Sequence, residues 1–594
     1  MARAALPHAG DAVATWPNLY PGWAACSQSR SQVACRCGVW RGLEPEVASV
    51  GPGEPITPGA RVPKMLETLK PLSVQRPIQY ILVWLLLKLS GGRRKPLRIN
   101  RLHLCLSLCL LVSLPEAGQA QKGPDRKREF LEMYARAYYP GRSGQIMLVP
   151  REGDFVTLNE PASLFMHGSP WSYDADIPLL FFGPPYIRRG TYADAAAQQD
   201  IVPTLARLLR LPLPPTVTGR SLDKALDSSA GRPRAILVIV LDGMRQDYFE
   251  RHREVMPTLT RLRREGAWFS NARVNFLPTV TALGHATIGT GADPRVHGIV
   301  VNTAFDRISG KPQSPYPGMS PRTLMALTLA DLWNLETEGQ AVIISQGSIF
   351  VAVAGLVGHG ACLLNAQPTI LASYSSQGGW ETNSECYKLP EYLKNQKSAP
   401  LWEAAHGQWM GHDIANPDAV SRSALFPKFE ADALVAMIEN EPVGADDVTD
   451  LLLVNLKAPD FVGHQYGPDS PEMRETLAEQ DRQLARILEA LEKKAGANRV
   501  VVVITADHGM PPEPQAPRKR YFNKDVVELV HKKFDPDRAA LVTHFDARNN
   551  QLFVDKNRLR ELGLKLSQIK EYLEAQPFIY AAYTEDEVKN ASSR

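Results

Sequence analysis

Three largely apolar runs along the chain are each followed by side chains that can bind a metal ion. Runs of this length predict strands that are buried on both faces of a parallel sheet. Parallel strands present their carboxyl ends at one sheet edge, where open α/β sheets carry out their chemistry, so we expect these side chains to gather there. The runs and the side chains that follow them are residues 235–241 with Asp242, residues 450–456 with Asp460 and His464, and residues 499–505 with Asp507 and His508.

Two helices are predicted beside these strands. Residues 472–494 are charged and strongly helical in pattern, and they predict a helix that crosses over the sheet. A second, smaller helix is predicted to begin at Thr281, where Pro278-Thr279-Val280 leads into the small residues ALGHATIGTG. A hydroxyl in the first turn of a helix feels the positive end of the helix dipole, which favours an alkoxide. Thr281 is therefore a candidate nucleophile, with Thr279 as its competitor.

The two ends of the chain after residue 120 carry further elements. At the front, a short amphipathic helix is predicted within residues 121–140, and His167-Gly168-Ser169 precedes a buried strand at residues 177–182. At the far end, the pattern predicts a hairpin that turns at Asn549-Asn550, a helical segment over residues 559–573 and an apolar strand at residues 578–583.

The first 120 residues read as a leader. The basic segment RRKPLRINR at residues 93–101 precedes an apolar core of 13 residues and then Gly118 and Ala120. This order predicts a secretory signal peptide at about residues 93–120, cleaved after Ala120, and hence a periplasmic or secreted protein. The core is too short to span a membrane comfortably, so membrane contact is expected only through an uncleaved leader.

The residues before the signal peptide show no sustained period, and we expect most of the leader to be disordered. An over-extended translation start, with Met65 as a later start, and a genuine membrane-proximal tail both explain their presence.

Charge and cysteine usage narrow the class of protein. Residues 1–120 hold 14 of the 67 Lys and Arg and 6 of the 63 Asp and Glu, so residues 121–594 carry 53 basic and 57 acidic side chains. A basic nucleic-acid surface is therefore not indicated. After Ala120 the only cysteines are Cys362 and Cys386, which predict one disulfide in an exported chain, two free thiols being the alternative. The oligomeric state stays open.

Asp242 and Thr281, followed by His297-Gly298-Ile299 and Asn302, resemble the alkaline phosphatase superfamily, in its type I phosphodiesterase/nucleotide pyrophosphatase branch. The resemblance implies an α/β fold with a doubly wound, mostly parallel central sheet and helices on both faces. It places insertions at about residues 305–420 and 510–555. It also implies a hydrolase of small-molecule phosphoric esters that uses two zinc ions, with other divalent ions possible.

The same resemblance assigns the site residues. It implies that Thr281 is phosphorylated and then released by hydrolysis, and that Asn302 donates a hydrogen bond to a nonbridging oxygen. Thr281 is preferred over Thr279 because its 21-residue separation from Asn302 and its GHAT helix match the family. His285 and His297 are interpreted as packing and turn residues outside the metal-binding set. One metal would take Asp460, His464 and His167, and the other Asp242, Asp507, His508 and the Thr281 oxygen.

One segment of the family pattern occurs in a different order along this chain. The His167-Gly168-Ser169 turn resembles the family's closing segment, yet it precedes Thr281. Joining the chain ends would put His167 about 130 residues after His508, close to the family interval. We therefore predict a circular permutation, in which residues 121–228 are the C-terminal portion and residues 235–594 the main portion of one catalytic domain. A fused or misassembled gene is the alternative.

The predicted substrate class depends on two positions that lack cationic side chains. Family members that prefer monoesters carry a Lys-x-Arg pair, and the matching positions here are Ser345 and Gly347. Without two cations the site attracts a dianionic phosphate less strongly, which favours a phosphodiesterase or nucleotide pyrophosphatase. An alkaline phosphatase acting on monoesters is the alternative, and an inactive rearranged binding protein is the alternative of another class. A sulfatase is excluded because Thr281 cannot be matured to the required aldehyde.

Overall fold

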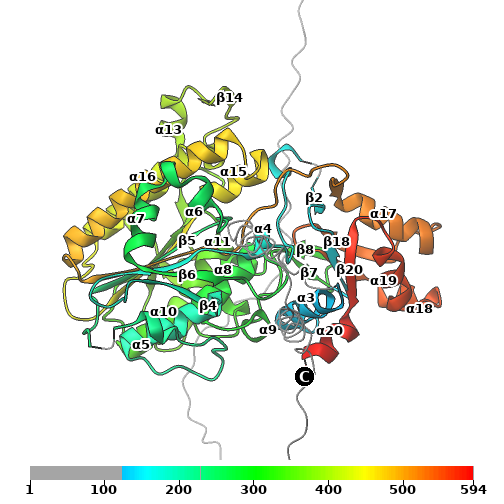
Figure 1. Ribbon diagram of the computed structural model, residues 1–594, viewed down its shortest axis with the longest axis horizontal. Helices are drawn as coiled ribbons and strands as arrows, with labels where there is room; N and C mark the ends of the chain where they lie inside the picture. Colours follow the sequence, from blue (N-terminus) through cyan, green and yellow to red (C-terminus); the bar gives the residue numbers. More distant parts are fainter. Residues whose placement is uncertain (1–122, 159, 228, 593–594) are drawn as a thin grey trace, which may run out of the picture. The chain divides into compact units, whose positions relative to one another are not determined.

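The computed structural model describes residues 123–592 except residues 159 and 228 (Figure 1). The predicted leader and its signal peptide lie outside the described residues. Within the described part of the chain, none of the helices is both long and apolar enough to cross a bilayer.

A ten-stranded sheet forms the core of the described residues. The three apolar runs lie side by side at its centre in parallel, with Leu456 opposite Leu241, and every residue of the three strands is buried. Each buried Val, Leu or Ile contributes about 1.5–3 kcal/mol, which explains why these apolar runs form the centre. In order along the sheet the strands are β11 (Trp380–Glu381), β10 (Thr369–Tyr374), β9 (Ile343–Gly347), β15 (Asp450–Leu456), β5 (Ala235–Leu241), β16 (Val500–Thr505), β3 (Leu179–Phe182), β6 (Ala267–Ala272) and β4 (Gly190–Ala196), with β12 (Tyr387–Lys388) beside β10.

The sheet is mostly parallel, as predicted, with two antiparallel exceptions. Strand β3 runs antiparallel to both of its neighbours, β16 and β6, and the short β11 runs antiparallel to β10. Strand β3 comes from the front of the chain, so residues far apart in sequence complete one sheet.

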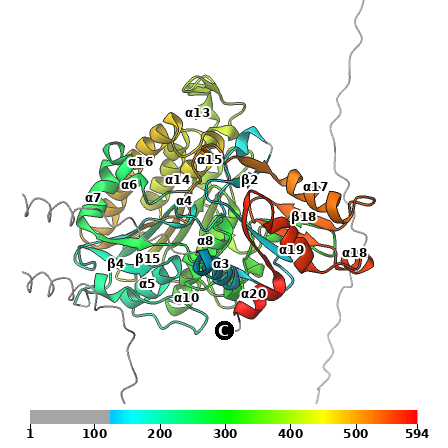
Figure 2. The same ribbon diagram turned by 45° about the vertical axis from the view of Figure 1, so that its right-hand side comes forward.

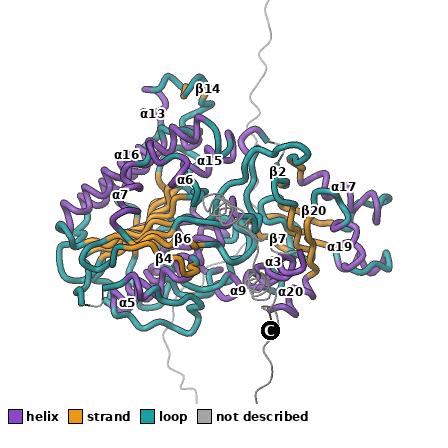
Figure 3. Tube along the Cα trace, in the orientation of Figure 1, coloured by secondary structure: helices purple, strands orange, loops and turns teal. Residues whose placement is uncertain are grey.

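Helices cover both faces of this sheet (Figure 3). The predicted crossover helix is α16 (Pro471–Ala495); Ser470 caps its first turn, and Leu477, Leu484 and Leu491 are buried against the sheet side. It packs with α14 (Phe426–Asn440) and α7 (Pro257–Glu265). On the other face lie α8 (Thr281–Thr290), α11 (Phe350–Val357), α10 (Leu329–Glu336) and α5 (Ile201–Leu209). The doubly wound α/β prediction is confirmed.

A second, four-stranded sheet combines the two ends of the described chain. Its order is β18 (Val542–Asp546), β19 (Gln551–Val554), β1 (Ile146–Pro150) and β20 (Ile579–Thr584), so the early strand β1 lies between two late strands. Beside it, α3 (Gly123–Ala137) packs against α20 (Glu585–Ser592) (Figure 2). Ser592 Oγ donates to Ala135 O at 3.1 Å.

Two expectations for the far end have different outcomes. The hairpin at Asn549-Asn550 is confirmed by the antiparallel pairing of β18 and β19. The helical segment predicted over residues 559–573 is two helices, α18 (Lys556–Glu561) and α19 (Leu566–Glu574), which pack with α17 (Asn523–Phe534) around this sheet. Gly563, at φ +64°, makes the turn between them because glycine adopts this backbone conformation without steric cost.

The predicted disulfide between Cys362 and Cys386 is present, with 4.8 Å between the two Cα atoms. It closes a loop around β10, and Cys386 is fully buried. The structure therefore has the predicted disulfide and not the alternative of two free thiols.

Replacing Cys362 and Cys386 together by serine should lower the free energy of unfolding by about 3 kcal/mol, because the crosslink limits the unfolded chain across a 24-residue separation. Chemical denaturation of the variant and the parent measures the difference. Reducing the parent with dithiothreitol should reproduce it. Equal stabilities would show that the crosslink does not form in solution.

Candidate metal centre and nucleophile

The candidate ligands lie where three neighbouring strands end. Asp242 follows β5, and Asp507 and His508 follow β16 after a single intervening residue. Strand β15 leads into α15 (Ala458–Tyr466), which carries Asp460 and His464 four residues apart and therefore on one face. Gly243, at φ +69°, makes the turn after β5, and a Cβ there would lie 3.0 Å from Asp460 Cα. Glycine thus allows β5 and α15 to approach closely.

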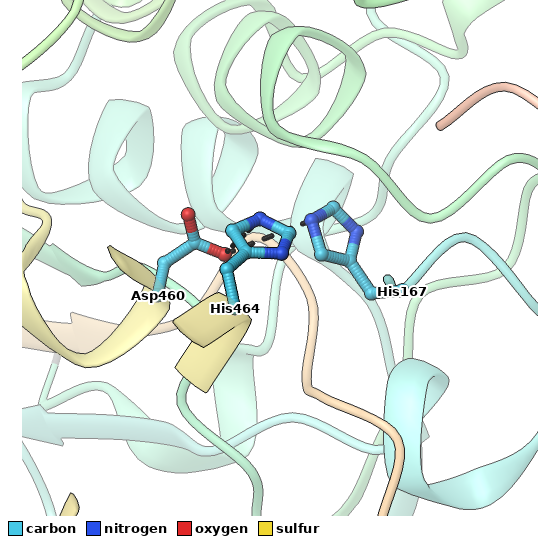
Figure 4. A group of neighbouring side chains, drawn as sticks. All are labelled: His167, Asp460 and His464. Atoms are coloured by element: carbon cyan, nitrogen blue, oxygen red, sulfur yellow. Dashed lines mark ion pairs between the residues drawn. The ribbon is translucent and has the colours of Figure 1, made fainter. Parts of the chain in front are cut away.

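The first group of candidate ligands is His167, Asp460 and His464 (Figure 4). Asp460 Oδ1 lies 3.3 Å from His464 Nε2 and 3.6 Å from His167 Nε2. The Nδ1 atom of His167 pairs with Thr279 O at 2.8 Å, and that of His464 with Phe165 O at 2.6 Å. A carbonyl can only accept, so each Nδ1 carries the hydrogen and each neutral ring turns the Nε2 lone pair toward Asp460. This is the tautomer that a metal requires.

The second group is Asp242, Asp507 and His508. His508 Nε2 lies 3.2 Å from Asp507 Oδ2 and 3.6 Å from Asp242 Oδ1, while its Nδ1 donates to Gly509 O at 2.9 Å. The rings of His167 and His508 stack with their centroids 3.4 Å apart. The two groups therefore adjoin, and His167 from the front of the chain is next to ligands from its far end.

The donor atoms of both groups fit a bound cation. Asp460 Oδ1 and Asp507 Oδ2 are buried and accept no hydrogen bond from any described residue. An unpartnered buried carboxylate oxygen is costly, and each of these atoms faces an imidazole Nε2. Imidazole nitrogen combined with carboxylate oxygen is a ligand set that zinc favours, and each group supplies three ligands, which leaves a position for substrate.

Electrostatics at the centre also favour added positive charge. Burial and the Asp507 carboxylate raise the pKa of Asp242 well above its ordinary value. Burial also raises the pKa of Asp507, but the facing His508 outweighs it and holds that pKa well below its ordinary value. Burial and the neighbouring His508 lower the pKa of His167 well below 6.5, so that ring is neutral at pH 7.

Thr281 is the first residue of α8, and its buried Oγ1 lies 3.2 Å from His508 Nε2. A Cβ on Gly284 would lie 2.7 Å from Asp507 Cβ, so this glycine lets the helix approach the second group. Asn302 lies beside the start of the helix, where its Oδ1 accepts a hydrogen bond from Ala282 N at 2.7 Å. The structure thus brings both predicted catalytic side chains to the candidate metal centre.

Thr279 and His285, which lie near the candidate ligands, form hydrogen bonds with other residues. Thr279 Oγ1 donates to Ser169 O at 3.0 Å and holds the turn that carries His167. His285 donates from Nδ1 to Thr281 O at 2.9 Å and accepts from Asn455 Nδ2 at Nε2, also at 2.9 Å.

His297 is the last residue of α9 (Pro294–His297). It donates from Nε2 to Thr287 Oγ1 at 3.1 Å and accepts at Nδ1 from Ile299 N at 3.2 Å. Burial lowers the pKa of His285 to about 4 and that of His297 to about 3. Both rings are therefore neutral at pH 7, and both have their two nitrogens in hydrogen bonds.

Sequence reasoning missed Lys457, which lies between the two groups. Its Nζ donates to Asp242 Oδ1 at 2.7 Å and to Thr281 Oγ1 at 3.2 Å, and it forms an ion pair with Asp460 Oδ2 at 2.8 Å. Its place directly after a buried strand, at the edge where the ligands gather, is a signal that could have found it.

Ser345 and Gly347, which stand where monoester-preferring family members carry a Lys-x-Arg pair, lie on β9. Ser345 Oγ donates to Val353 O at 3.3 Å, and a Cβ added to Gly347 would lie 2.7 Å from Asn455 Cβ. Asn455 in turn donates from Nδ2 to Asp242 Oδ2 at 2.8 Å. Strand β9 therefore brings no cationic side chain from these positions to the centre.

A sequence profile of the type I phosphodiesterase/nucleotide pyrophosphatase family matches residues 236–593. The chain belongs to this family, and it is a hydrolase of phosphoric esters. The profile begins inside β5 and ends near the last described residue, so His167 and β3 fall outside it.

Curated relatives agree with this assignment, and a solved structure agrees with the fold. The chain is 26% identical to alkaline phosphatase PafA of Elizabethkingia meningoseptica over 61% of this chain and 77% of that protein. It is 27% identical to alkaline phosphatase PhoV of Synechococcus elongatus over 58% and 72%. The crystal structure of a multiply substituted PafA superposes with a TM-score of 0.50 at 23% identity, over 58% of this chain and 76% of that one, and supports the fold.

Affinity for a divalent cation, with zinc as the probe, should rise with pH up to about pH 9. Burial lowers the pKa of His508, but the Asp507 and Asp242 carboxylates outweigh burial and raise it to about 9. The metal-free His508 ring therefore holds a proton at pH 7, and it must lose that proton before it can bind a metal ion. Binding should weaken by up to about tenfold for each pH unit below 9.

Titration calorimetry of metal-free protein at pH 7, 8 and 9, in buffers of different protonation enthalpy, measures both the affinity and the protons released. His508→Asn should abolish most of the pH dependence. An affinity that is constant from pH 7 to 9, without proton release, would contradict the protonation state inferred for His508.

Proposed function

We propose that the protein is an exported, zinc-dependent phosphodiesterase or nucleotide pyrophosphatase with Thr281 as its nucleophile. The observation that carries this proposal is the position of Thr281 Oγ1, 3.2 Å from His508 Nε2 and beside two groups of carboxylate and imidazole ligands in which Asp460 Oδ1 and Asp507 Oδ2 lack a hydrogen-bond partner among the described residues. A hydroxyl at the start of a helix and next to bound cations is readily converted to an alkoxide.

The residues take distinct roles in the proposed site. His167, Asp460 and His464 would hold one zinc ion, and Asp242, Asp507, His508 and Thr281 Oγ1 would hold the other. When bound, the pair of ions neutralises charge on the phosphoryl group and on the attacking and leaving oxygens. Asn302 Oδ1 is fixed by Ala282 N, and Asn302 Nδ2 makes no hydrogen bond with the described residues. That amide is therefore available to donate to a nonbridging phosphoryl oxygen.

The proposed reaction proceeds in two displacements. Thr281 Oγ1 loses its proton and forms a bond to phosphorus, and the ester bond breaks with its electron pair on the departing oxygen, which takes up a proton. Water then attacks the phosphothreonine, and the bond between phosphorus and Oγ1 breaks. A diester thus yields an alcohol and a phosphate monoester, and Thr281 regains its hydroxyl.

A diester or pyrophosphate substrate is favoured because Ser345 and Gly347 supply no cations to a second negative charge. The second candidate is an alkaline phosphatase acting on monoesters. It is favoured by the names of the relatives PafA and PhoV and by the single ammonium of Lys457. Neither candidate predicts a nucleic-acid surface, and the expected substrate is a small molecule.

Export to the periplasm or the exterior is supported from two directions. The signal-peptide pattern at residues 93–120 is one. The other is the disulfide between Cys362 and Cys386, since such bonds persist in oxidising compartments.

We also propose that the catalytic domain is circularly permuted, with residues 121–228 as its original ending. Three observations support this order: β1 pairs with both β19 and β20, β3 pairs with β16, and the family profile covers only residues 236–593. The packing of α3 against α20 brings the proposed joining points together.

Thr281→Ala should leave about two zinc ions bound and abolish turnover, because the attacking oxygen is lost while Asp242, Asp507 and His508 still hold the second ion. The zinc-loaded protein without its leader is assayed with bis-nitrophenyl phosphate and nitrophenyl phosphate, and metal content is measured by mass spectrometry. We expect the diester to be hydrolysed faster. Thr279→Ala tests the competing hydroxyl: once loaded with zinc it should still turn over, with at most weaker zinc binding because Thr279 Oγ1 holds the His167 turn.

Undiminished hydrolysis by Thr281→Ala would refute the nucleophile. A strong monoester preference would favour the phosphatase candidate. A folded protein that binds no zinc and hydrolyses neither ester would instead indicate a rearranged binding protein.

A reordered chain should fold and keep its activity. In it, residues 235–594 come first, followed by a flexible Gly/Ser linker and residues 121–228. Circular dichroism and diester hydrolysis compare it with the parent. Residues 235–594 alone should be insoluble or inactive, since they lack His167 and β3, which pairs with both β16 and β6. Failure of the reordered chain to fold would contradict the permutation.

A further inference from the structure

Lys457 is a fully enclosed cation at the candidate metal centre. The side chain is 2% exposed, and it is among the largest buried side chains of the described residues. Lysine is almost never buried to this extent unless its charge is paired. The residue is also held through its backbone, because Lys457 N donates to the buried carboxylate of Glu430 at 3.1 Å. Both the backbone and the side chain of Lys457 are thus fixed in the fold.

The ammonium has three oxygen atoms of the centre within reach. A lysine Nζ has three N–H groups, and Lys457 has three acceptors at hydrogen-bond distance: Asp242 Oδ1, Asp460 Oδ2 and Thr281 Oγ1. The first two belong to different metal-ligand groups, and the third is the proposed nucleophile. Nζ also lies 5.5 Å from the centre of the Phe461 ring, which favours a cation.

The ammonium does not occupy the place of the metal ions. Asp460 gives Oδ2 to Lys457 and leaves Oδ1, which faces the Nε2 atoms of His167 and His464, without a partner. Asp507 Oδ2 in the second group is also left without a partner. Lys457 therefore adds a positive charge to a centre that keeps its free ligand atoms.

The ammonium is held in a fixed position. Its Nζ lies 2.7 Å from Asp242 Oδ1 and 2.8 Å from Asp460 Oδ2, so a carboxylate from each ligand group pairs with it. The cation that a phosphoryl-transfer site needs is thus not supplied by β9, where Ser345 and Gly347 stand, but by the end of β15.

We propose that Lys457 is a catalytic residue of phosphoryl transfer, whose ammonium donates a hydrogen bond to Thr281 Oγ1 as that oxygen attacks phosphorus. This rests on the proposed function. As Oγ1 loses its proton and bonds to phosphorus, Lys457 keeps all its protons and stabilises the negative charge on Oγ1 and on the adjoining phosphoryl oxygens. When water later cleaves the phosphothreonine, the same N–H stabilises Oγ1 as the leaving oxygen.

The test compares variants that remove or keep the charge. Lys457→Met keeps the apolar stem and removes the ammonium, Lys457→Gln keeps one polar N–H group without charge, and Lys457→Arg keeps the charge. Exposed Lys493 on α16 is the matched control, as Lys493→Met. Each is zinc-loaded and assayed for kcat and KM with bis-nitrophenyl phosphate, for phosphothreonine formation in a single turnover, and for zinc affinity by calorimetry.

We expect Lys457→Met to lower kcat and the rate of phosphothreonine formation by about 100-fold or more, the usual effect of removing a donor to a developing oxyanion. KM should change much less, and zinc affinity should be equal or tighter because a nearby positive charge is gone. Lys457→Arg should recover part of the loss, Lys457→Gln less, and Lys493→Met should match the parent.

A Lys457→Met protein with the parent kcat overturns the proposal. So does a loss of rate that only parallels weaker zinc binding, which would make Lys457 a support for the ligands. If Lys457→Met does not fold, the comparison of Lys457→Arg with Lys457→Gln decides, and equal rates overturn the proposal. The parent and Thr281→Ala are run beside these variants, and a parent without zinc-dependent hydrolysis would instead refute the proposed function.

Discussion

The repulsion among three buried carboxylates governs this structure. Asp242, Asp460 and Asp507 converge where β5, β15 and β16 end, and each is at most 1% exposed. Buried anions this close together are tolerated only when cations or hydrogen-bond donors meet them. The Lys457 ammonium, the facing imidazoles and the asparagine amide of Asn455 meet part of that demand. The unpartnered oxygens of Asp460 and Asp507 mark the remainder, which two divalent cations would satisfy.

The order of segments along the chain matters little for this arrangement, because the sheet determines it. Strand β3 and the His167 turn come from the front of the chain, yet they lie against β16 and α15 from the far end. The same holds for β1, between β19 and β20. A permuted order is therefore compatible with the family's site, provided that the joined ends lie close together, as α3 and α20 do.

Apolar periodicity predicted the central strands well because burial on both faces leaves a continuous apolar run, and the bounds of β5 and β15 match the prediction. The acidic and histidine ligands could be predicted because they end those runs. Lys457 was missed because residue type alone describes a lysine as solvent-exposed. Its place directly after β15 was the one signal in the sequence, and its partners become evident only where Asp242, Asp460 and Thr281 converge. The antiparallel direction of β3 and the break at Gly563 likewise depend on tertiary packing and local turn geometry.

The central claim is that two metal ions flank Thr281 and that His167 binds one of them. Anomalous diffraction at the zinc edge from zinc-loaded crystals tests it directly. The account predicts two peaks about 4 Å apart, one in contact with His167, Asp460 and His464 and the other with Asp242, Asp507 and His508. A single peak, or two peaks with His167 beyond bonding distance of either, would contradict it.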